Sequence, residues 1–355
     1  MSQAKTKNTW PIFKGNRTQH DGIADIPKAP KWRLFEENLS LANLYIPDRN
    51  LEHFNEGEKH RATTLQTNEK IIELVNAALY LRRPLLVTGK AGTGKSSLAY
   101  AVAYELKLGK VLYWPITSRS TLSDALYRYD ALGRLQDTNI VRAGEDGDLD
   151  QKKAETYIGK YIRLGPLGTA LLPTHIPQVL LIDEIDKSSI DLPNDLLYIF
   201  ETGGFEIPEL SRLPDTEENK YIDVFPQVGG KSAKIYRGQV TCKEFPFVVI
   251  TSNGEREFPP AFLRRCIRLD IDEPDKDQLA QIVENKFLAE GFDKDKIDSL
   301  IVQFLSKRQA GDLATDQLLN AIYLTMCGVN LDKQFNDKSE LIDAILRHLS
   351  TQEIA

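Results

Sequence analysis

Cysteine is scarce in this chain of 355 residues: Cys242, Cys266 and Cys327 are the only three, and they lie far apart in the sequence. A small odd number of distant cysteines indicates neither a disulfide framework nor a zinc site, and it is typical of reduced thiols in the cytoplasm. Long apolar runs are also lacking, since no stretch approaches the ~20 residues of a membrane-spanning helix. The first residues, Met1 to Lys5, lack the apolar centre of a secretion signal. We therefore expect a cytoplasmic protein without a membrane segment.

An excess of basic residues is missing too, because 45 Lys and Arg stand against 51 Asp and Glu, for a net charge of −6. A surface that is basic throughout and wraps nucleic acid is not expected, although a local basic pore is compatible with this balance. The histidines are dispersed, and no Ser/His/Asp or Cys/His grouping indicates a second catalytic chemistry. The apolar share of 41% is ordinary for a globular protein. The length has room for roughly two domains.

A glycine-rich segment after the apolar run 85–87 fits a phosphate-binding loop. It matches the pattern G-x-x-x-x-G-K-[ST], and a helix-favouring run, 97–103, follows it. Glycines let successive backbone N–H groups curl round an anion, and the N-terminus of the next helix adds partial positive charge. In this pattern the lysine reaches the β- and γ-phosphates, and the last hydroxyl joins a Mg²⁺ shell. The predicted nucleotide-binding residues are Gly89, Lys90, Ala91, Gly92, Thr93, Gly94, Lys95, Ser96 and Ser97.

Two carboxylates, Asp183 and Glu184, end the apolar run 179–182. In a phosphate-loop enzyme the first would hold Mg²⁺ together with Ser96, and the second would orient and polarise the attacking water. A lone run of this kind is often only a strand that stops at the surface, but the phosphate loop upstream favours the functional interpretation. Binding alone does not need Glu184, so the pair predicts hydrolysis.

Two later segments complete the catalytic hypothesis. A further apolar strand ends at Asn253, whose neutral amide would hydrogen-bond the γ-phosphate or the water. Asn commonly ends strands in turns, so this signal rests on its order behind the other motifs. Arg264 and Arg265 close a short helix, and an arginine beside the γ-phosphate stabilises charge in phosphoryl transfer, often from a neighbouring subunit. The alternative is a surface pair bonded to acids such as Asp270 or Asp272.

The order of the apolar runs predicts a parallel sheet. Short apolar strands alternate with helical patterns, which is typical of a buried parallel sheet between helices. After Pro274 the pattern is helical only, so we expect a small all-helical region there. The predicted strands span 85–87, 111–117, 179–182, 247–251 and 267–271, and the predicted helices 68–81, 275–290, 295–307, 315–327 and 338–350.

Residues 1–65 read as irregular, because repeated prolines interrupt any helix. A disordered tail is usually poor in aromatic residues, and this stretch is not. We expect an extended arm whose aromatic side chains dock on a folded surface, its own or a neighbour's, and a flexible tail is the alternative. These aromatic residues are Trp10, Phe13, Trp32 and Phe35.

The order of these motifs resembles that of AAA+ ATPases over about residues 66–350. The motifs are the phosphate-binding loop, the strand that ends in Asp-Glu, the strand that ends in Asn and the arginine pair, and a helical lid follows them. The finer resemblance is to the MoxR-like and dynein-related branch. Segment 164–170 is similar to its Gly-Pro-Leu segment, 123–160 to an insertion in the second helix, and 201–231 to its hairpin before the Asn strand. The implied fold is α/β, a P-loop NTPase with a five-stranded parallel sheet between helices and a helical lid. The implied domains are an arm over 1–65, an AAA+ nucleotide-binding domain over 66–272 and a lid over 273–355.

The resemblance implies a ring, usually a hexamer, with ATP and Mg²⁺ at each subunit junction. Lys95, Ser96, Asp183, Glu184 and Asn253 would act within one subunit, and Arg264 and Arg265 on the neighbour's nucleotide. MoxR-like ATPases act as chaperone-like remodellers, often beside proteins with a von Willebrand factor A-type domain, so a protein partner of this class is expected.

One position departs from the family pattern. The lid usually presents an arginine to the phosphates, and Asp316 falls roughly where that arginine is expected. Lys307 and Arg308 are the nearby cations that would replace it.

Two alternatives to protein remodelling stay open. One is a nucleic-acid motor of a restriction or defence system, and the other is a slow nucleotide-gated assembly switch. No Asn-Lys-x-Asp tetrad for reading guanine occurs, since Asn285-Lys286 is followed by Phe287-Leu288, and this favours ATP over GTP.

Overall fold

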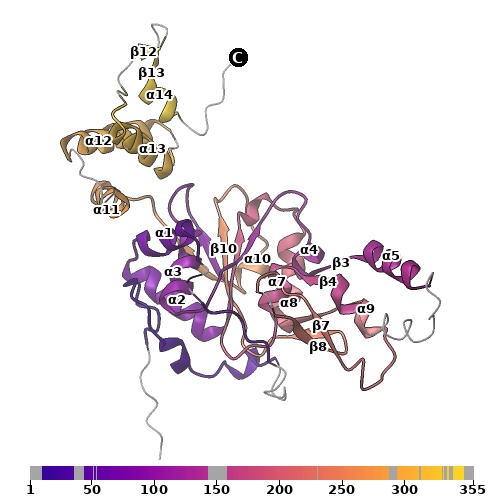
Figure 1. The fold of residues 1–355 in the computed structure, drawn as a ribbon. Coiled ribbons are helices and arrows are strands. Elements are labelled where there is room, and N and C mark those ends of the chain that lie inside the picture. Colours follow the sequence, from indigo (N-terminus) through magenta and orange to yellow (C-terminus); the bar gives the residue numbers. More distant parts are fainter. Residues whose placement is uncertain are drawn as a thin grey trace, which may run out of the picture.

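A parallel five-stranded sheet forms the centre of the molecule (Figure 1). The structure, a computed structural model, describes residues 10–35, 44–50, 52, 54–142, 158–229, 231–287, 294–311, 313–329, 331, 334–335 and 339–347. The strand order is β11-β1-β10-β5-β2, and every pairing within this sheet is parallel. This confirms the predicted α/β fold. The strands are β1 (Leu85–Thr88), β2 (Leu112–Pro115), β5 (Val179–Asp183), β10 (Phe247–Ser252) and β11 (Ile267–Asp270).

Alternate side chains of each central strand enter two separate cores. In β5, Val179 and Leu181 join one hydrophobic cluster while Leu180 and Ile182 join the other. Because successive side chains of a strand point to opposite faces, a strand with continuous apolar sequence is buried on both sides. Helices α2 (Glu69–Leu81) and α3 (Ser97–Glu105) contribute to the first cluster, and α7 (Pro166–Ala170) and α8 (Leu192–Thr202) to the second.

Two insertions extend the sheet domain. Between β5 and β10 the chain forms an antiparallel four-stranded sheet where a hairpin is predicted, with the order β6-β9-β8-β7. Between β2 and β5, strand β3 pairs with β4, and α5 lies in the connection. Residues 143–157 of the predicted second-helix insertion lie outside the described residues. The elements of these insertions are β3 (Tyr127–Tyr129), β4 (Ile162–Leu164), β6 (Gly204–Glu206), β7 (Tyr221–Val224), β8 (Ala233–Tyr236), β9 (Gln239–Thr241), α4 (Leu122–Leu126), α5 (Ala131–Arg142) and α9 (Pro208–Ser211). Helix α10 (Pro260–Leu263) follows β10 outside both insertions.

The described part of the N-terminal arm docks on its own chain. Phe13 and Phe54 are buried in the core that contains α2 and α3, whereas Trp32 is 75% exposed. The arm also departs from the predicted irregular structure, because helix α1 (Glu56–Thr64) lies within it. The side chains of Asn55 and Glu58 form a capping box at its N-terminus.

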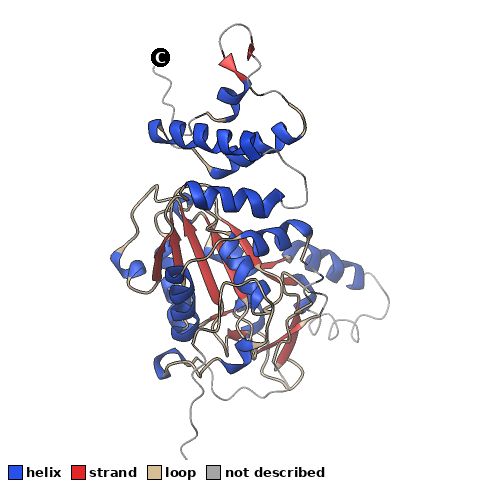
Figure 2. Cartoon of the chain, turned by 90° about the vertical axis from the view of Figure 1, so that its left-hand side faces the viewer, coloured by secondary structure: helices blue, strands red, loops and turns tan. Residues whose placement is uncertain are grey.

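The C-terminal region is mainly helical and has its own hydrophobic cluster. Figures 1 and 2 both place it beyond one end of the central sheet. Its helices are α11 (Lys276–Phe287), α12 (Lys294–Ala310), α13 (Thr315–Met326) and α14 (Leu341–Ile345). The predicted helix 338–350 is wrong at its start, because β13 (Ser339–Glu340) pairs there with β12 (Gln334–Phe335) in a two-stranded ladder and α14 begins only at Leu341. Among the described residues, no helix is both long and apolar enough to cross a membrane.

Candidate nucleotide-binding site

The glycine-rich loop joins β1 to α3 and uses backbone conformations that glycine tolerates best. Gly89, Gly92 and Gly94 have φ angles of 151°, 78° and 84°. A Cβ on Gly89 would lie 2.5 Å from the Ile271 carbonyl oxygen, and one on Gly92 would lie 2.7 Å from the Thr315 nitrogen. Both the curl of the loop and its close approach to neighbouring backbone therefore require glycine.

Lys95 is buried beneath this loop, with 6% of its surface exposed. Its Nζ donates to the carbonyl oxygens of Gly89 and Lys90, each at 2.7 Å. Burial lowers the pKa of Lys95, and the carboxylates of Asp186, Asp183 and Glu184 oppose that shift. The loop thus holds a cation in a partly desolvated position. Its electrostatic attraction to phosphate oxygens would be stronger there than in water.

Three hydroxyl groups converge on Asp183 at the end of β5. Ser96 Oγ donates to Asp183 Oδ1 at 2.6 Å, and Thr251 Oγ1 donates to the same oxygen at 2.7 Å. Tyr113 OH donates to Asp183 Oδ2 at 3.3 Å. Thr251 and Tyr113 lie on β10 and β2, the two strands beside β5, so the strand order gathers these groups.

The oxygen atoms of Ser96 and Asp183 suit Mg²⁺, which prefers hard oxygen ligands and binds through few protein groups when phosphates and water fill the other positions. Among the residues that the structure describes, there is no group of three or more His, Cys, Asp or Glu residues that could hold a metal ion. This donor set fits a cation that arrives with a nucleotide.

Glu184 follows Asp183 in a left-handed conformation, with φ 61° and ψ 52°. This region is uncommon for a residue with a side chain, and such residues gather at functional sites. The Glu184 N–H donates to Thr251 Oγ1 at 2.8 Å. Its carboxylate accepts from Lys187 Nζ at 2.7 Å and from Asn253 Nδ2 at 3.5 Å. The predicted pair of Glu184 and Asn253 is therefore brought together.

Asp186, which the motifs did not reveal, fixes the loop after β10. It is 7% exposed, and its Oδ2 accepts the backbone N–H groups of Asn253 at 2.8 Å and Glu255 at 3.3 Å. Tyr113 and Thr251 also escape motif reasoning, because each looks like an ordinary strand residue.

The two arginines lie at the opposite end of the sheet. The phosphate loop, Asp183 and Asn253 follow the carboxyl ends of parallel strands. Arg264 and Arg265 precede the amino end of β11, whose Ile267 is level with Leu85, the first residue of β1. A strand of four residues is about 13 Å long. Arg264 and Arg265 are therefore separated from the phosphate loop of their own chain by about the length of one strand.

Arg265 is tied within its own chain. Its Nε donates to Glu201 Oε1 at 2.5 Å, and its Nη1 donates to the Ala261 carbonyl at 3.1 Å. Arg264 is exposed, and its carbonyl accepts from Arg83 Nη1 at 3.0 Å. Neither arginine lines the cavity at the phosphate loop. Glu201, not Asp270 or Asp272, is the acid that Arg265 meets.

The loop opens into a cavity of about 660 Å³. Its walls are the phosphate loop, α1 with residues 64–68, and the C-terminal helices α11 and α13. A cavity of this size holds a drug-sized or cofactor-sized molecule. Asp183, Glu184 and Asn253 are among its lining residues.

The cation on the lid side is not the one predicted. Lys307 pairs with Asp343, Arg308 donates to the Pro274 carbonyl at 2.9 Å, and neither lines the cavity. Lys286 and Asp316 line it instead. Burial lowers the pKa of Lys286, Asp316 opposes the shift, and Arg61 adds to it. Lys286 is thus the lysine that the helical region presents to this cavity.

A glycine-rich loop between β1 and α3 and an Asp-Glu pair at the end of β5, a parallel strand separated from β1 by β10, define a P-loop NTPase fold. The chain belongs to the family of the AAA domain, dynein-related subfamily, whose family model matches residues 84–266. A curated relative is RuvB-like helicase 1 of Emericella nidulans, which is 30% identical over 142 residues, 36% of this chain and 31% of that protein. The match therefore spans about a third of that relative's length.

Solved structures that are similar to the chain include three ADP complexes. The S. cerevisiae Hsp104–ADP complex has a TM-score of 0.36 at 16% identity, over 65% of this chain and 38% of that one. NtrX from Brucella abortus has a TM-score of 0.38 at 13% identity, over 84% and 59%. The FIGL-1 AAA domain has a TM-score of 0.37 at 17% identity, over 84% and 83%.

Proposed function

We propose that this chain is a ring-forming ATPase that couples ATP hydrolysis at subunit junctions to the remodelling of a protein partner. The observation that carries the proposal is the split between the two ends of the sheet. The phosphate loop, Asp183, Glu184 and Asn253 gather at one end, and the arginine pair lies at the other. A chain with this topology supplies the phosphate half of one site and the arginine half of the next.

In the proposed reaction, the loop amides and Lys95 bind the phosphates, while Ser96 and Asp183 would hold Mg²⁺, which would neutralise phosphate charge. Glu184 orients a water and accepts its proton as the water oxygen bonds to the γ-phosphorus. The bond from that phosphorus to the β–γ bridging oxygen breaks, giving ADP and phosphate. Asn253 steadies the Glu184 carboxylate through its amide.

The arginines complete the proposed junction from the neighbouring subunit. Glu201 and Ala261 occupy Nε and Nη1 of Arg265, and a guanidinium has five N–H donors. The donors that remain would face the neighbour's γ-phosphate, where an arginine stabilises developing charge. The proposed division into arm (1–65), nucleotide-binding domain (66–272) and lid (273–355) places the junction on the middle domain.

Oligomeric state and turnover test this proposal together. Purified chain should form a ring, expected to be a hexamer, when ATP is added, and its ATP turnover per subunit should rise with protein concentration. Light scattering after size exclusion and a phosphate-release assay measure the two quantities. A monomer that hydrolyses ATP at a concentration-independent rate would contradict the shared site. GTP in place of ATP tests the base preference.

The proposed partner is a protein, and one with a von Willebrand factor A-type domain is the first candidate class. Capture on a Glu184→Gln variant, which should hold ATP, would identify it. The second candidate function is a nucleic-acid motor, because the curated relative is named a helicase. Strong stimulation of turnover by DNA or RNA, with a steep salt dependence, would favour the motor and overturn protein remodelling.

A further inference from the structure

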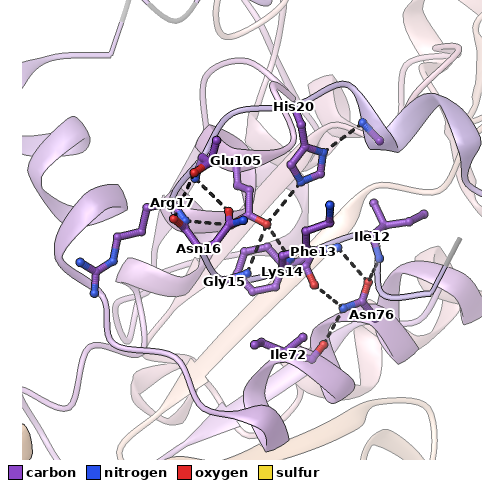
Figure 3. Close-up of polar contacts among 12 residues, drawn as sticks. Ile12, Phe13, Lys14, Gly15, Asn16, Arg17, His20, Ile72, Asn76 and Glu105 are labelled. Atoms are coloured by element: carbon purple, nitrogen blue, oxygen red, sulfur yellow. Dashed lines mark hydrogen bonds and ion pairs between the residues drawn. The ribbon is translucent and has the colours of Figure 1, made fainter.

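Residues 12–20 of the N-terminal arm are held against α2 and α3 by two buried polar side chains (Figure 3). The first is Asn76 on α2, which is fully buried. Its Oδ1 accepts the N–H groups of Ile12 at 2.8 Å and Phe13 at 2.9 Å. Its Nδ2 donates to the carbonyls of Phe13 and Ile72, each at 2.7 Å. Both acceptor sites and both donors of the amide are used, and three of the four bonds go to the arm.

The second is Glu105, the last residue of α3, which is 1% exposed. Its Oε1 accepts the N–H groups of Lys14 at 2.6 Å and Gly15 at 3.2 Å, and its Oε2 accepts that of Arg17 at 3.2 Å. His20 Nε2 lies 3.5 Å from Oε1 (Figure 3). A buried carboxylate is costly unless it is hydrogen-bonded, so this segment of the arm and α3 stabilise each other.

From this clamp the arm reaches the wall of the nucleotide cavity. Thr67 Oγ1 donates to the Gly15 carbonyl at 3.0 Å, and Arg17 Nη2 donates to the Leu65 carbonyl at 3.3 Å. Leu65 and Thr67 both line the cavity. Gly15 has φ 64°, and a Cβ there would lie 2.3 Å from Thr67 Oγ1. The arm therefore fits between Glu105 and the wall only because residue 15 has no side chain.

The wall itself needs such support. Residues 65–68 connect α1 to α2 without helix or strand structure of their own. A segment of this kind keeps one conformation only through contacts with other parts of the chain. The bonds to Gly15 and Arg17 are two of those contacts, and neither Gly15 nor Arg17 lines the cavity.

We propose that Gly15 and Arg17 position the cavity wall at residues 65–68, so that the arm sets the affinity for the nucleotide without taking part in its hydrolysis. The inference rests on the proposed function, since it takes a nucleotide as the occupant of this cavity. A wall already held in its bound conformation loses less conformational freedom when the ligand binds, and this strengthens binding.

The test is the variant Gly15→Ala, which adds a methyl group against Thr67. We expect its Kd for ADP, measured by calorimetry on the full chain, to rise about tenfold, equivalent to the loss of one or two hydrogen bonds. KM for ATP should rise with it, while kcat at saturating ATP stays near the wild-type value. Gly328→Ala is the matched control, because Gly328 has φ 80° and no atom lies within 4 Å of its added Cβ.

A second pair of variants guards against misfolding of the first. Arg17→Met removes only the side-chain bond to Leu65 and should weaken ADP binding, and Arg17→Lys should restore it. The role of the arm is contradicted if Gly15→Ala and Arg17→Met bind ADP as tightly as the wild-type chain does. If Lys95→Ala still loses ADP binding in the same assay, the proposed function is unaffected by that result. Absence of ADP binding by the wild-type chain overturns the proposed function as well.

Discussion

The phosphate-loop half and the arginine half of the candidate site differ in how far one chain can assemble them. At the carboxyl end of the sheet, Asp183 and Glu184 bond to residues on the two strands beside β5 and to Ser96 at the start of α3. At the amino end, Arg265 meets Glu201 and lies outside the cavity. Parallel strands separate the two halves by construction, because residues before a strand and residues after it lie at opposite edges. In the proposed ring, one chain would supply the first half of the site and its neighbour the second.

Removal of Arg265 should have the largest effect on turnover. We expect Arg265→Ala to lower kcat by about 10³–10⁵, the usual contribution of such an arginine, while ATP binding is retained. A phosphate-release assay and an ATP titration measure the two quantities. Arg268→Ala serves as the control, because Arg268 is an exposed arginine on β11.

A mixture of Arg265→Ala with Lys95→Ala tests which chain supplies the arginine. A junction with its loop from the first variant and its arginine from the second is intact, so the mixture should recover part of the activity that each variant lacks. Two inactive variants that stay inactive when mixed would show that Arg265 does not serve a neighbour.

Removal of the Glu184 charge should have the next largest effect. Glu184→Gln keeps the shape of the side chain but weakens proton acceptance, so turnover should fall by about 10²–10⁴ with ATP still bound. Glu255→Gln, an exposed acid close to Asn253 in the chain, is the control. Turnover near the wild-type rate in Glu184→Gln would remove Glu184 as the water-orienting residue.

Glu201 should matter for turnover only through Arg265. Glu201→Ala frees the guanidinium that Glu201 orients, and we expect kcat to fall about tenfold with KM for ATP unchanged, as for a lost bond between charged groups. Glu244→Ala removes a comparable Glu–Arg pair, in which Arg82 Nε lies 3.1 Å from Glu244, and should leave kcat unchanged. A loss of the same size in both variants would indicate general destabilisation.

The smallest effect is expected at Lys286. Burial and the nearby Lys286 charge lower the pKa of His60. Lys286→Met removes one positive charge, so protonation of His60 becomes easier and its pKa should rise, as measured by NMR titration. The same variant should weaken ATP binding severalfold, the scale of one partly exposed charge contact. Lys307→Met should change neither quantity, and a His60 pKa that moves only in Lys307→Met would reverse the assignment.

Much of the fold can be predicted from the sequence because the central strands are apolar without interruption. Such runs are buried on both faces and leave little choice of structure, and the glycine-rich loop marks the turn between β1 and α3. Helix α1 carries no such apolar signal in its sequence. Ala62 is its one buried residue, so no apolar period marks it, and the signal lies in Asn55 and Glu58 at its capping box.

Part of the candidate site depends on which strands and helices become neighbours. Tyr113 and Thr251 meet Asp183 only because β2 and β10 flank β5. Lys286 lines the cavity although Lys307 and Arg308 are closer in sequence to Asp316, because α11 and not α12 faces the loop. Separation in the sequence says little about such contacts, because they depend on how the strands and helices pack.

The inserted sheet β6-β9-β8-β7 has consequences for engineering. The inserted chain begins after Gly203 and ends at Cys242, where the Cys242 N–H donates to the Gly203 carbonyl at 2.9 Å. The strands on either side, β5 and β10, pair directly with each other. A different inserted module whose two ends lie equally close together could be joined at these two residues. The entropy cost of closing a loop rises only slowly with its length, so a longer module would add little to that cost. Gly203 and Cys242 are therefore where another insertion could be joined, provided that it replaces the apolar side chains, such as Ile207, Val224 and Ile235, that this sheet contributes to the core shared with β5.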